Sequence, residues 1–251
     1  MKIIAVTQAR CGSSRLPNKI LKTVGDQTLL QLHVARILQA KNITQLIIAT
    51  TTAPADAVIA DLAAQYGVAA SRGSEQDVLD RFYQAVKDLQ PDYVVRLTSD
   101  CPLIDPALID KVIDFAVSNN LDYCSNTLDP TYPDGQDVEV VRFAALERAW
   151  HEAVLPSERE HVTPFVWKNS TYKGGTFFRS DNFSESYDYG HLRMTVDEPQ
   201  DYEVICDLVA QAGVDKTWLE YAEILNNNAE IRLRNAALGR NEGYAKSIHN
   251  D

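Results

Sequence analysis

A short apolar run followed by a cationic loop decides the fold: Ile3-Ile4-Ala5-Val6-Thr7 precedes Gln8-Ala9-Arg10-Cys11-Gly12-Ser13-Ser14-Arg15-Leu16-Pro17-Asn18-Lys19. The apolar run predicts a strand that is buried on both faces. Ligands of open α/β sheets bind beyond the carboxyl ends of the strands, so the following loop is well placed for binding. Its amides, hydroxyls and fixed cations are the groups that a polyphosphate needs. The alternative is a basic surface loop with solvated charges. The clustering of cations directly after a buried strand favours the phosphate interpretation.

Strand and helix patterns alternate through the first half of the chain. Apolar runs at 46–50, 68–71 and 93–98 predict strands, and helical spacing predicts helices over 29–39, 54–66, 77–89 and 106–117. Asp105 is a plausible N-cap of the last of these helices. Alternation of this kind predicts an α/β fold with a mainly parallel sheet covered on both faces.

The rhythm changes after residue 119. We expect strands at 122–125, 138–143, 172–178 and 191–196, and helices at 143–154, 158–168, 201–211 and 218–226. We expect residues 239–251 to form a polar, mobile tail. No internal repeat or long linker divides the chain, so we expect a single domain with the middle region inserted on one sheet.

Composition excludes several classes of protein. The formal net charge is −11, which argues against a nucleic-acid-binding protein because binding a phosphate backbone needs a cationic face. A local pocket of Arg and Lys remains compatible with an acidic surface. No apolar stretch is long enough for a membrane span, and no signal peptide is evident. The cysteines show no zinc-like spacing, so we expect free thiols and a cytoplasmic location.

Two further predicted strands end in an Asp. Asp100 follows 93–98, and Asp197 follows 191–196. Each Asp has a structural alternative as a helix N-cap, a function that Asp201 is also placed to serve. Carboxylates at strand ends also suit Mg²⁺, which usually shares its oxygen ligands with substrate phosphates. Together with the cationic loop, they point to metal-assisted attack at a phosphorus atom.

Several segments resemble one enzyme family. Residues 9–19 resemble the signature loop of the sugar cytidylyltransferases, which include 3-deoxy-manno-octulosonate and acylneuraminate cytidylyltransferases. Arg72-Gly73-Ser74-Glu75-Gln76-Asp77-Val78-Leu79-Asp80-Arg81 resembles the nucleotide-facing segment of that family. The motifs at 134–139 and 159–164 resemble the branch typified by spore coat polysaccharide biosynthesis protein F. The resemblance extends from residue 1 to about residue 213.

The resemblance implies a three-layer α/β/α, Rossmann-like fold of the nucleotide-diphospho-sugar transferase type. It also implies that CTP and a sugar give a CMP-sugar and pyrophosphate, with Mg²⁺ held by Asp100 and Asp197. The implied catalytic residues are Arg10, Arg15, Lys19 and Asp100. The implied nucleotide-binding residues are Ala9, Arg10, Gly12, Ser13, Ser14, Arg15, Lys19, Arg72, Gly73, Ser74, Asp77 and Arg81. Asp77 has an alternative as a helix N-cap, with Arg81 as its i,i+4 partner.

The family resemblance also implies an acceptor region. Residues 1–119 would form the nucleotide-binding half, 120–190 the acceptor-binding and dimerisation insertion, and 191–238 the closing elements. The implied acceptor-binding residues are Asp137, Glu139, Arg159, Glu160 and His161. Arg159 would recognise a carboxylate of an acidic sugar, although a solvated helix face is its structural alternative. A homodimer is implied, with CTP and a small sugar as its ligands.

Two other functions remain open on the residues alone. A glycosyltransferase of similar architecture typically carries an Asp-x-Asp motif at the end of a central strand. The corresponding segment here is Ser99-Asp100-Cys101-Pro102, without the second Asp. A non-catalytic nucleotide-binding protein is the other alternative, and the presence of the cationic loop together with both strand-end carboxylates argues against it.

Overall fold

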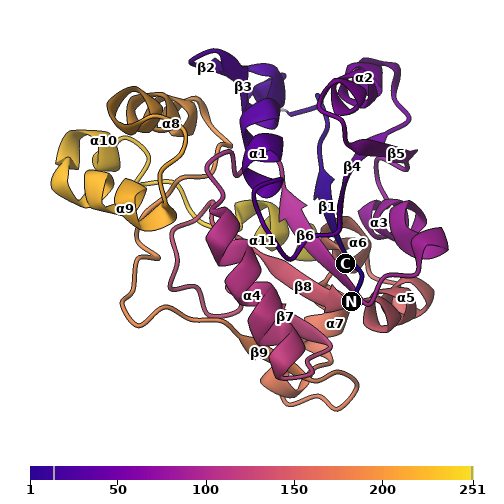
Figure 1. The fold of residues 1–251 in the computed structure, drawn as a ribbon. Coiled ribbons are helices and arrows are strands. Elements are labelled where there is room, and N and C mark those ends of the chain that lie inside the picture. The colour runs from indigo at the N-terminus through magenta and orange to yellow at the C-terminus, as the bar shows by residue number, and fades with distance from the viewer. Residues whose placement is uncertain (14, 250) are drawn as a thin grey trace.

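A computed structural model describes residues 1–13, 15–249 and 251. Its central sheet has seven strands in the order β5-β4-β1-β6-β8-β7-β9, and β2 and β3 form a separate hairpin (Figure 1). Only β8 runs against the other strands of the large sheet. The strands are β1 (Ile3–Gln8), β2 (Thr23–Val24), β3 (Gln27–Thr28), β4 (Gln45–Thr51), β5 (Ala69–Gly73), β6 (Tyr93–Thr98), β7 (Tyr123–Ser125), β8 (Glu139–Arg142) and β9 (Ser180–Asn182). The expected mixed, mainly parallel α/β sheet is confirmed.

Helices cover both faces of this sheet. The α-helices are α1 (Leu29–Ile37), α2 (Ala57–Gln65), α3 (Val78–Val86), α4 (Pro106–Ser118), α5 (Phe143–Glu152), α6 (Pro156–His161), α7 (Pro164–Lys168), α8 (Pro199–Ala212), α9 (Trp218–Asn227), α10 (Ala229–Leu233) and α11 (Glu242–Ile248). Short 3₁₀ turns are η1 (Lys19–Leu21), η2 (Pro54–Asp56), η3 (Lys87–Leu89) and η4 (Thr171–Lys173). None of the described helices is both long and apolar enough to cross a membrane.

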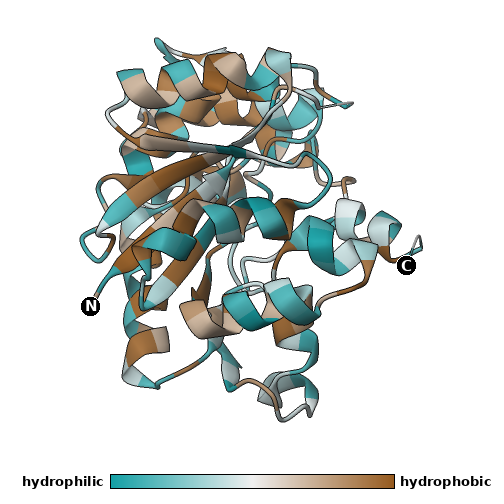
Figure 2. Ribbon diagram, turned by 90° about the vertical axis from the view of Figure 1, so that its right-hand side faces the viewer, coloured by the Kyte–Doolittle hydropathy of each residue, from teal (hydrophilic) through white to brown (hydrophobic). Residues whose placement is uncertain are grey.

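Alternate residues of the strands supply two separate cores. Ile3 and Ala5 of β1 pack in one cluster with α1, α2, α4, α8 and α9. Ile4 and Val6 pack in the other, with α3, α5 and α7. Successive strand side chains point to opposite faces, so a strand of continuous apolar residues needs both layers. Apolar residues accordingly run along the strands in Figure 2.

The order of strands brings two loops to one edge of the sheet. β1 pairs in parallel with β4 on one side and with β6 on the other. In the large sheet, the strands up to β5 are added on one side of β1, and β6 is the first to be added on the other side, so the strand order changes direction between β1 and β6. Gln8 pairs with Thr98 at the strand ends, and Ser99 N donates to Gln8 O at 3.3 Å. The loops after these strands therefore start side by side, at the position where open α/β sheets bind ligands.

Two expected strands are wrong. Over 172–178 the chain forms η4 and then turns, with Gly174 at φ +79°. A Cβ on Gly175 would lie 2.4 Å from the Asn169 backbone, so the turn needs Gly there. Over 191–196, only an isolated bridge joins Arg193 to Asp134, because Gly135 brings the two segments together at a single close approach.

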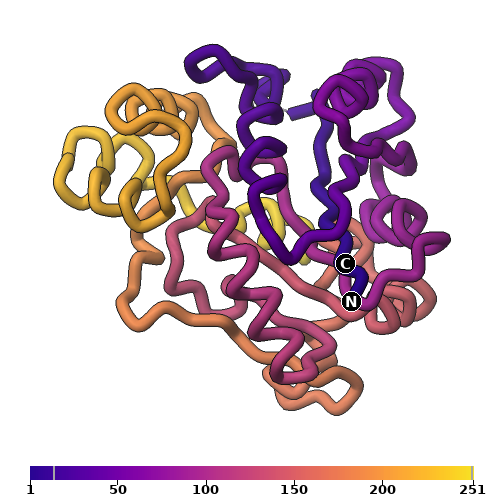
Figure 3. The backbone as a smooth tube through the Cα atoms, viewed as in Figure 1, coloured from indigo at the N-terminus to yellow at the C-terminus, as the bar shows by residue number. Residues whose placement is uncertain are grey.

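The polar tail expected at 239–251 contains a helix. Residues 242–248 form α11, which packs against α6. In Figure 3 the yellow end of the tube passes behind the sheet rather than leaving the molecule. Arg240 anchors the start of this segment through Asp137 at 2.5 Å, and the Asp251 carboxylate accepts a 2.6 Å bond from Ser157 Oγ. Long-range polar contacts thus order a segment whose sequence looks like solvent-exposed chain.

Candidate active site

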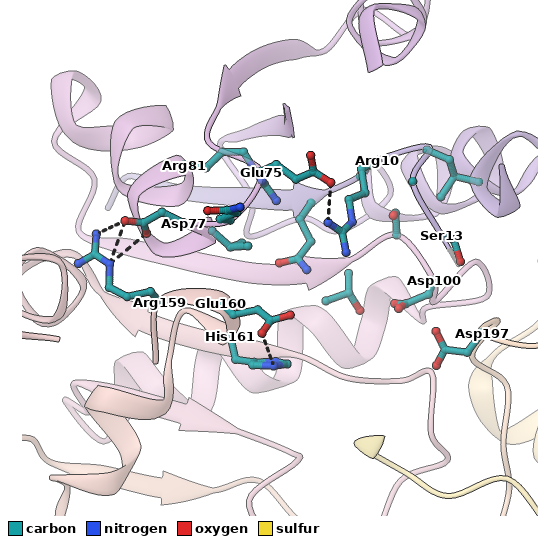
Figure 4. A pocket seen from close by; sticks show the side chains of 18 of the residues that line it. Arg10, Ser13, Glu75, Asp77, Arg81, Asp100, Arg159, Glu160, His161 and Asp197 are labelled. Carbon is teal, nitrogen blue, oxygen red and sulfur yellow. Dashed lines mark hydrogen bonds and ion pairs between the residues drawn. The ribbon is translucent and has the colours of Figure 1, made fainter. Parts of the chain in front are cut away.

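A cleft of about 1080 Å³ opens at the carboxyl ends of β1 and β6. The loops after β1, β5 and β6 line it, together with α6 and the segment before α8 (Figure 4). Of the predicted site residues, those in the lining are Ala9, Arg10, Gly12, Ser13, Arg15, Lys19, Asp77, Arg81, Asp100, Arg159, Glu160, His161 and Asp197. Ser14 lies outside the described residues, and its assignment stays a prediction.

Asp56 of η2 holds the start of the loop after β1 through a hydrogen bond. Its carboxylate accepts bonds from Cys11 N at 2.7 Å and from Thr51 Oγ1 at 2.5 Å. Ser13 N donates to Cys11 O at 2.9 Å, which tightens the turn. Asn18 adopts φ 53°, a left-handed conformation that Asn tolerates, and η1 begins directly after it. These contacts hold the backbone at Cys11, Ser13 and Asn18, next to Arg10 and Lys19.

Lys19 is bracketed by the two strand-end carboxylates. Its Nζ lies 2.9 Å from Asp197 Oδ1 and 3.4 Å from Asp100 Oδ2, and it donates to Val196 O at 2.8 Å. Burial alone would lower the pKa of Lys19, but the two carboxylates raise it above its usual value. Burial alone would likewise raise the pKa of Asp100, yet Lys19 and Thr98 bring it to about 2. Lys19 and Asp100 are therefore both charged at neutral pH.

The N-cap alternatives for Asp100 and Asp197 do not hold. Asp105 caps α4, accepting bonds from Ala107 N at 2.8 Å and Leu108 N at 3.3 Å, as the sequence predicted. Glu198 is the N-cap of α8. Asp100 and Asp197 instead direct their carboxylates toward Lys19 at the cleft.

The buried ion pair of Arg193 and Asp201 contacts Asp197 and fixes its position. Asp201 accepts bonds from Asp197 N at 2.9 Å and Glu198 N at 3.0 Å. Arg193 donates to both oxygens of Asp201 and lies 3.3 Å from Asp197 Oδ2. Sequence reasoning missed Arg193. The available signal was the position of Arg193 inside the expected strand 191–196, four residues before Asp197.

Arg10 and Arg15 lie nearer the surface of the cleft. Arg10 Nη1 is 3.2 Å from Glu75 Oε1, in a pair in which both side chains are about half exposed. Arg15 lies 3.1 Å from Asp197 and 3.3 Å from Glu198. Exposed pairs of this kind contribute little to stability, so both guanidinium groups are available to an anion. Glu75 was quoted in the sequence motif, but its pairing with Arg10 was not predicted.

Asp77 and Arg159 form the far end of the cleft. Asp77 caps α3 by accepting a hydrogen bond from Asp80 N at 2.8 Å. The prediction that Asp77 is a helix N-cap is therefore confirmed. Its carboxylate also accepts bonds from Arg159 Nε and Nη2, the latter at 2.6 Å. Arg159 is thus paired within the protein, and its recognition of an acceptor carboxylate stays a prediction. Arg81 donates to Ser74 O and makes no ion pair with Asp77 among the described residues.

Arg72, Gly73 and Ser74 support the cleft without lining it in the described structure. Arg72 donates to Thr51 O and Ala53 O, each at 2.9 Å, and so ties β5 to the end of β4. A Cβ on Gly73 would lie 3.2 Å from Arg81 Cγ. Ser74 Oγ accepts from Asp77 N at 3.0 Å. Their contact with a nucleotide remains a prediction.

The residues predicted for the acceptor divide between two places. Glu160 and His161 line the cleft, and both contact Ser247 of α11, at 2.7 Å and 3.0 Å. Burial lowers the pKa of His161, with Arg96 acting in the same direction, so its ring is neutral at pH 7. Glu139 lines a second, smaller cavity beside the cleft. Asp137 lines neither cavity and pairs with Arg240 instead.

The donor set suits a magnesium ion completed by other ligands. Asp100 and Asp197 present carboxylate oxygens on either side of a single buried ammonium group. Among the described residues, no group of three or more His, Cys, Asp or Glu side chains is arranged to hold a metal. Mg²⁺ commonly takes one or two carboxylates and fills its remaining positions with water and substrate phosphate. The residues present therefore fit such an ion.

A cationic loop and two carboxylates thus meet in a cleft at the carboxyl ends of the parallel strands of an α/β fold. Residues 4–236 match the family model described as cytidylyltransferase, so the chain belongs to the cytidylyltransferase family. The match confirms the resemblance drawn from the sequence motifs and favours it over the glycosyltransferase alternative.

Similar proteins agree with this membership. The chain is 38% identical over 239 residues to an uncharacterised protein of Methanocaldococcus jannaschii, covering 94% of this chain and 95% of that one. It is 31% identical over 247 residues to the spore coat polysaccharide biosynthesis protein SpsF of Bacillus subtilis, covering 94% and 98%. The structure of a cytidylyltransferase from Leptospira borgpetersenii superposes with a TM-score of 0.86 at 31% identity, over 92% of this chain and 97% of that one.

Proposed function

We propose that the protein transfers CMP from CTP to a sugar, releasing pyrophosphate, in the synthesis of a surface polysaccharide or glycan. The observation that carries this proposal is the position of Lys19 between Asp100 and Asp197 at the β1 and β6 ends. Arg10 and Arg15 flank that group on the same loop. The similarity to a spore coat polysaccharide biosynthesis protein supports a polysaccharide precursor as the product.

In the proposed reaction an oxygen of the sugar attacks the α-phosphorus of CTP. A new oxygen–phosphorus bond forms, the bond to the bridging oxygen breaks, and pyrophosphate leaves with the electron pair. Arg10, Arg15 and Lys19 would neutralise charge on the triphosphate and on the departing pyrophosphate, because fixed cations act on charge that develops during the reaction. Neutral His161, at the acceptor side of the cleft, would receive the proton of the sugar hydroxyl.

Asp100 and Asp197 would hold Mg²⁺. When bound, the ion neutralises phosphate charge and orients the triphosphate. Lys19 would offset the repulsion between the two carboxylates and hold them at the cleft before the nucleotide arrives. Arg193 and Asp201 would hold the Asp197 backbone in place.

We place the acceptor in the region of residues 120–190, beside α6, with an acidic sugar as the substrate class. Glu160 and His161 supply the polar edge of the cleft there, and Glu139 lies in the adjoining cavity. A carboxylate of the sugar would compete with Asp77 for the Arg159 guanidinium group. A cytoplasmic homodimer is the assembly that we expect, and light scattering of the purified protein tests its oligomeric state.

Pyrophosphate release provides the test of this function. Wild-type protein is incubated with Mg²⁺, CTP and either 3-deoxy-manno-octulosonate or N-acetylneuraminate, and phosphate is measured after coupling to pyrophosphatase. We expect release that requires both CTP and the sugar. Release of UDP from a UDP-sugar, with no pyrophosphate formed from CTP, would instead support the glycosyltransferase alternative.

A further inference from the structure

A second cavity of about 230 Å³ adjoins the cleft. His161 lines both spaces, so the cavity begins at the acceptor side of the proposed reaction. One wall comes from the sheet, through Arg96, Tyr123 and Glu139, and the opposite wall includes Tyr244 of α11. This second wall lies beyond residue 236, where the match to the family model ends.

Two buried polar atoms of this lining have no hydrogen-bond partner among the described residues. They are the hydroxyl of Tyr244 and Nε of Arg96. Most buried polar groups in proteins are paired, and leaving one unpaired costs free energy. By contrast, the Glu139 carboxylate is fully engaged by Arg96, Tyr123 and Thr163. Two elements that face the cavity therefore each carry a buried polar atom without a partner in the part of the chain that the structure describes, whereas the carboxylate of the lining is already paired.

Aromatic rings complete the same space. The Tyr244 ring lies 5.0 Å from the His161 ring and 6.0 Å from the Trp167 ring, in edge-on arrangements. Lys173, exposed at the margin, makes no ion pair among the described residues. Apolar ring surface combined with a few fixed polar groups is the usual make-up of a small-molecule site. An oxygen-rich ligand with a negative charge matches this lining.

α11 is coupled to the cleft through α6. Ser247 of α11 donates to Glu160 at 2.7 Å and lies 3.0 Å from His161 Nε2. Asp251 accepts from Ser157 N at 2.8 Å. These polar contacts hold the helix over the cavity.

We propose that α11 forms one wall of the subsite for the acidic sugar, and that Tyr244 is a specificity-determining residue that bonds a sugar oxygen. Arg96 Nε is the second group that meets the sugar. This inference rests on the proposed function, because it takes the sugar to be the acceptor of CMP. The wall lies outside the family-matched part of the chain, so it is the part able to differ between enzymes with different acceptors.

Tyr244→Phe tests the inference, with Tyr187→Phe as the matched control because Tyr187 is exposed at 63%. The Tyr244 hydroxyl has no partner to lose, so we expect the Tm of the free variant to equal or exceed that of the wild type. Loss of one hydrogen bond should raise the acceptor KM about three- to tenfold. The CTP-induced thermal shift and the KM for CTP should stay unchanged in both variants.

The outcomes separate the inference from the proposed function. Turnover with an unchanged acceptor KM in Tyr244→Phe overturns the role of α11 alone. A CTP thermal shift without turnover of 3-deoxy-manno-octulosonate or N-acetylneuraminate overturns the acidic-sugar subsite and leaves the nucleotide site standing. Absence of any CTP shift in the wild type overturns the proposed function itself.

Discussion

Lys19 Nζ lies 2.9 Å from Asp197 Oδ1, although the two residues are 178 positions apart in the chain. The loop after β1 and the segment before α8 thus meet at one ammonium group, which Asp100 also approaches from the end of β6. This junction joins the cationic half of the cleft to its acidic half. The chemistry proposed for the protein depends on it.

Removal of the Lys19 ammonium should abolish most of the turnover. We expect Lys19→Ala to lower kcat by about a hundredfold or more, since a fixed positive group is lost where charge develops. Lys22→Ala is the matched control, because Lys22 lies over the Tyr202 ring rather than in the cleft lining. Pyrophosphate release gives the rates and circular dichroism checks the fold. Equal kcat in the wild type and Lys19→Ala would remove Lys19 from the site.

The carboxylates should control metal dependence. We expect Asp100→Asn and Asp197→Asn each to raise the Mg²⁺ concentration needed for half-maximal activity, because each loses an anionic oxygen ligand. Asp26→Asn, at an exposed position, should behave as the wild type. Titration of activity with Mg²⁺ checks this. A normal titration curve in both cleft variants would place the ion elsewhere.

Stability in acid should depend on Asp100. Its pKa is about 2 in the folded protein against an ordinary value of 3.8, so its charged form is stabilised by folding. The contribution, about 2 kcal/mol, is present above pH 4 and is lost as the pH falls toward 2. Urea unfolding between pH 2.5 and 6 should therefore show a steeper loss of stability in the wild type than in Asp100→Asn. Parallel curves for the two proteins would contradict this sign.

Glu75 should compete with the triphosphate for Arg10. Their exposed ion pair is worth at most about 1 kcal/mol, so Glu75→Gln should lower the KM for CTP by up to about fivefold. Glu152→Gln removes a comparable exposed pair with Arg148, remote from the cleft lining, and serves as the control. An increase of KM in Glu75→Gln would show that Glu75 orients Arg10 for binding.

The cysteines near the site should resist alkylation. Burial raises the pKa of Cys11 to about 11, with Asp56 adding to the effect, and raises that of Cys101 well above its usual value. Thiolate is the reactive form, so iodoacetamide at pH 7.5 should modify these residues slowly in the folded protein and rapidly in urea. Peptide mass spectrometry follows each site. Fast modification of Cys11 in the native state would contradict the burial argument.

Local sequence patterns predicted most of the sheet. β6 begins at Tyr93 and ends at Thr98, as expected, because a short apolar run between polar turns is typical of a buried strand. The segment 172–178 contains Gly174-Gly175, a pair that is typical of a turn and argues against a strand. Leu192, Met194 and Val196 alternate as apolar residues because they are buried in the core, not because they pair along a strand.

The site was predictable where its residues lie on one loop and not where they come from distant segments. Arg10, Arg15 and Lys19 share a loop, and the strand-end positions of Asp100 and Asp197 follow from the parallel sheet. The pairing of Arg159 with Asp77 spans 82 residues, and that of Arg240 with Asp137 spans 103. Such partners are chosen by tertiary packing, which no local spacing encodes.

The most direct test of the nucleotide site is a thermal-shift panel on the wild-type protein with CTP, UTP, ATP, GTP and UDP-sugars, each with and without Mg²⁺. A ligand at a hundredfold excess over its Kd stabilises the native state by about 2.7 kcal/mol, which a thermal scan resolves. We predict a selective, Mg²⁺-dependent increase of Tm with CTP, and its loss in Lys19→Ala. An equal shift with every nucleotide, or a shift with UDP-sugars and none with CTP, would contradict the proposed cytidylyl transfer.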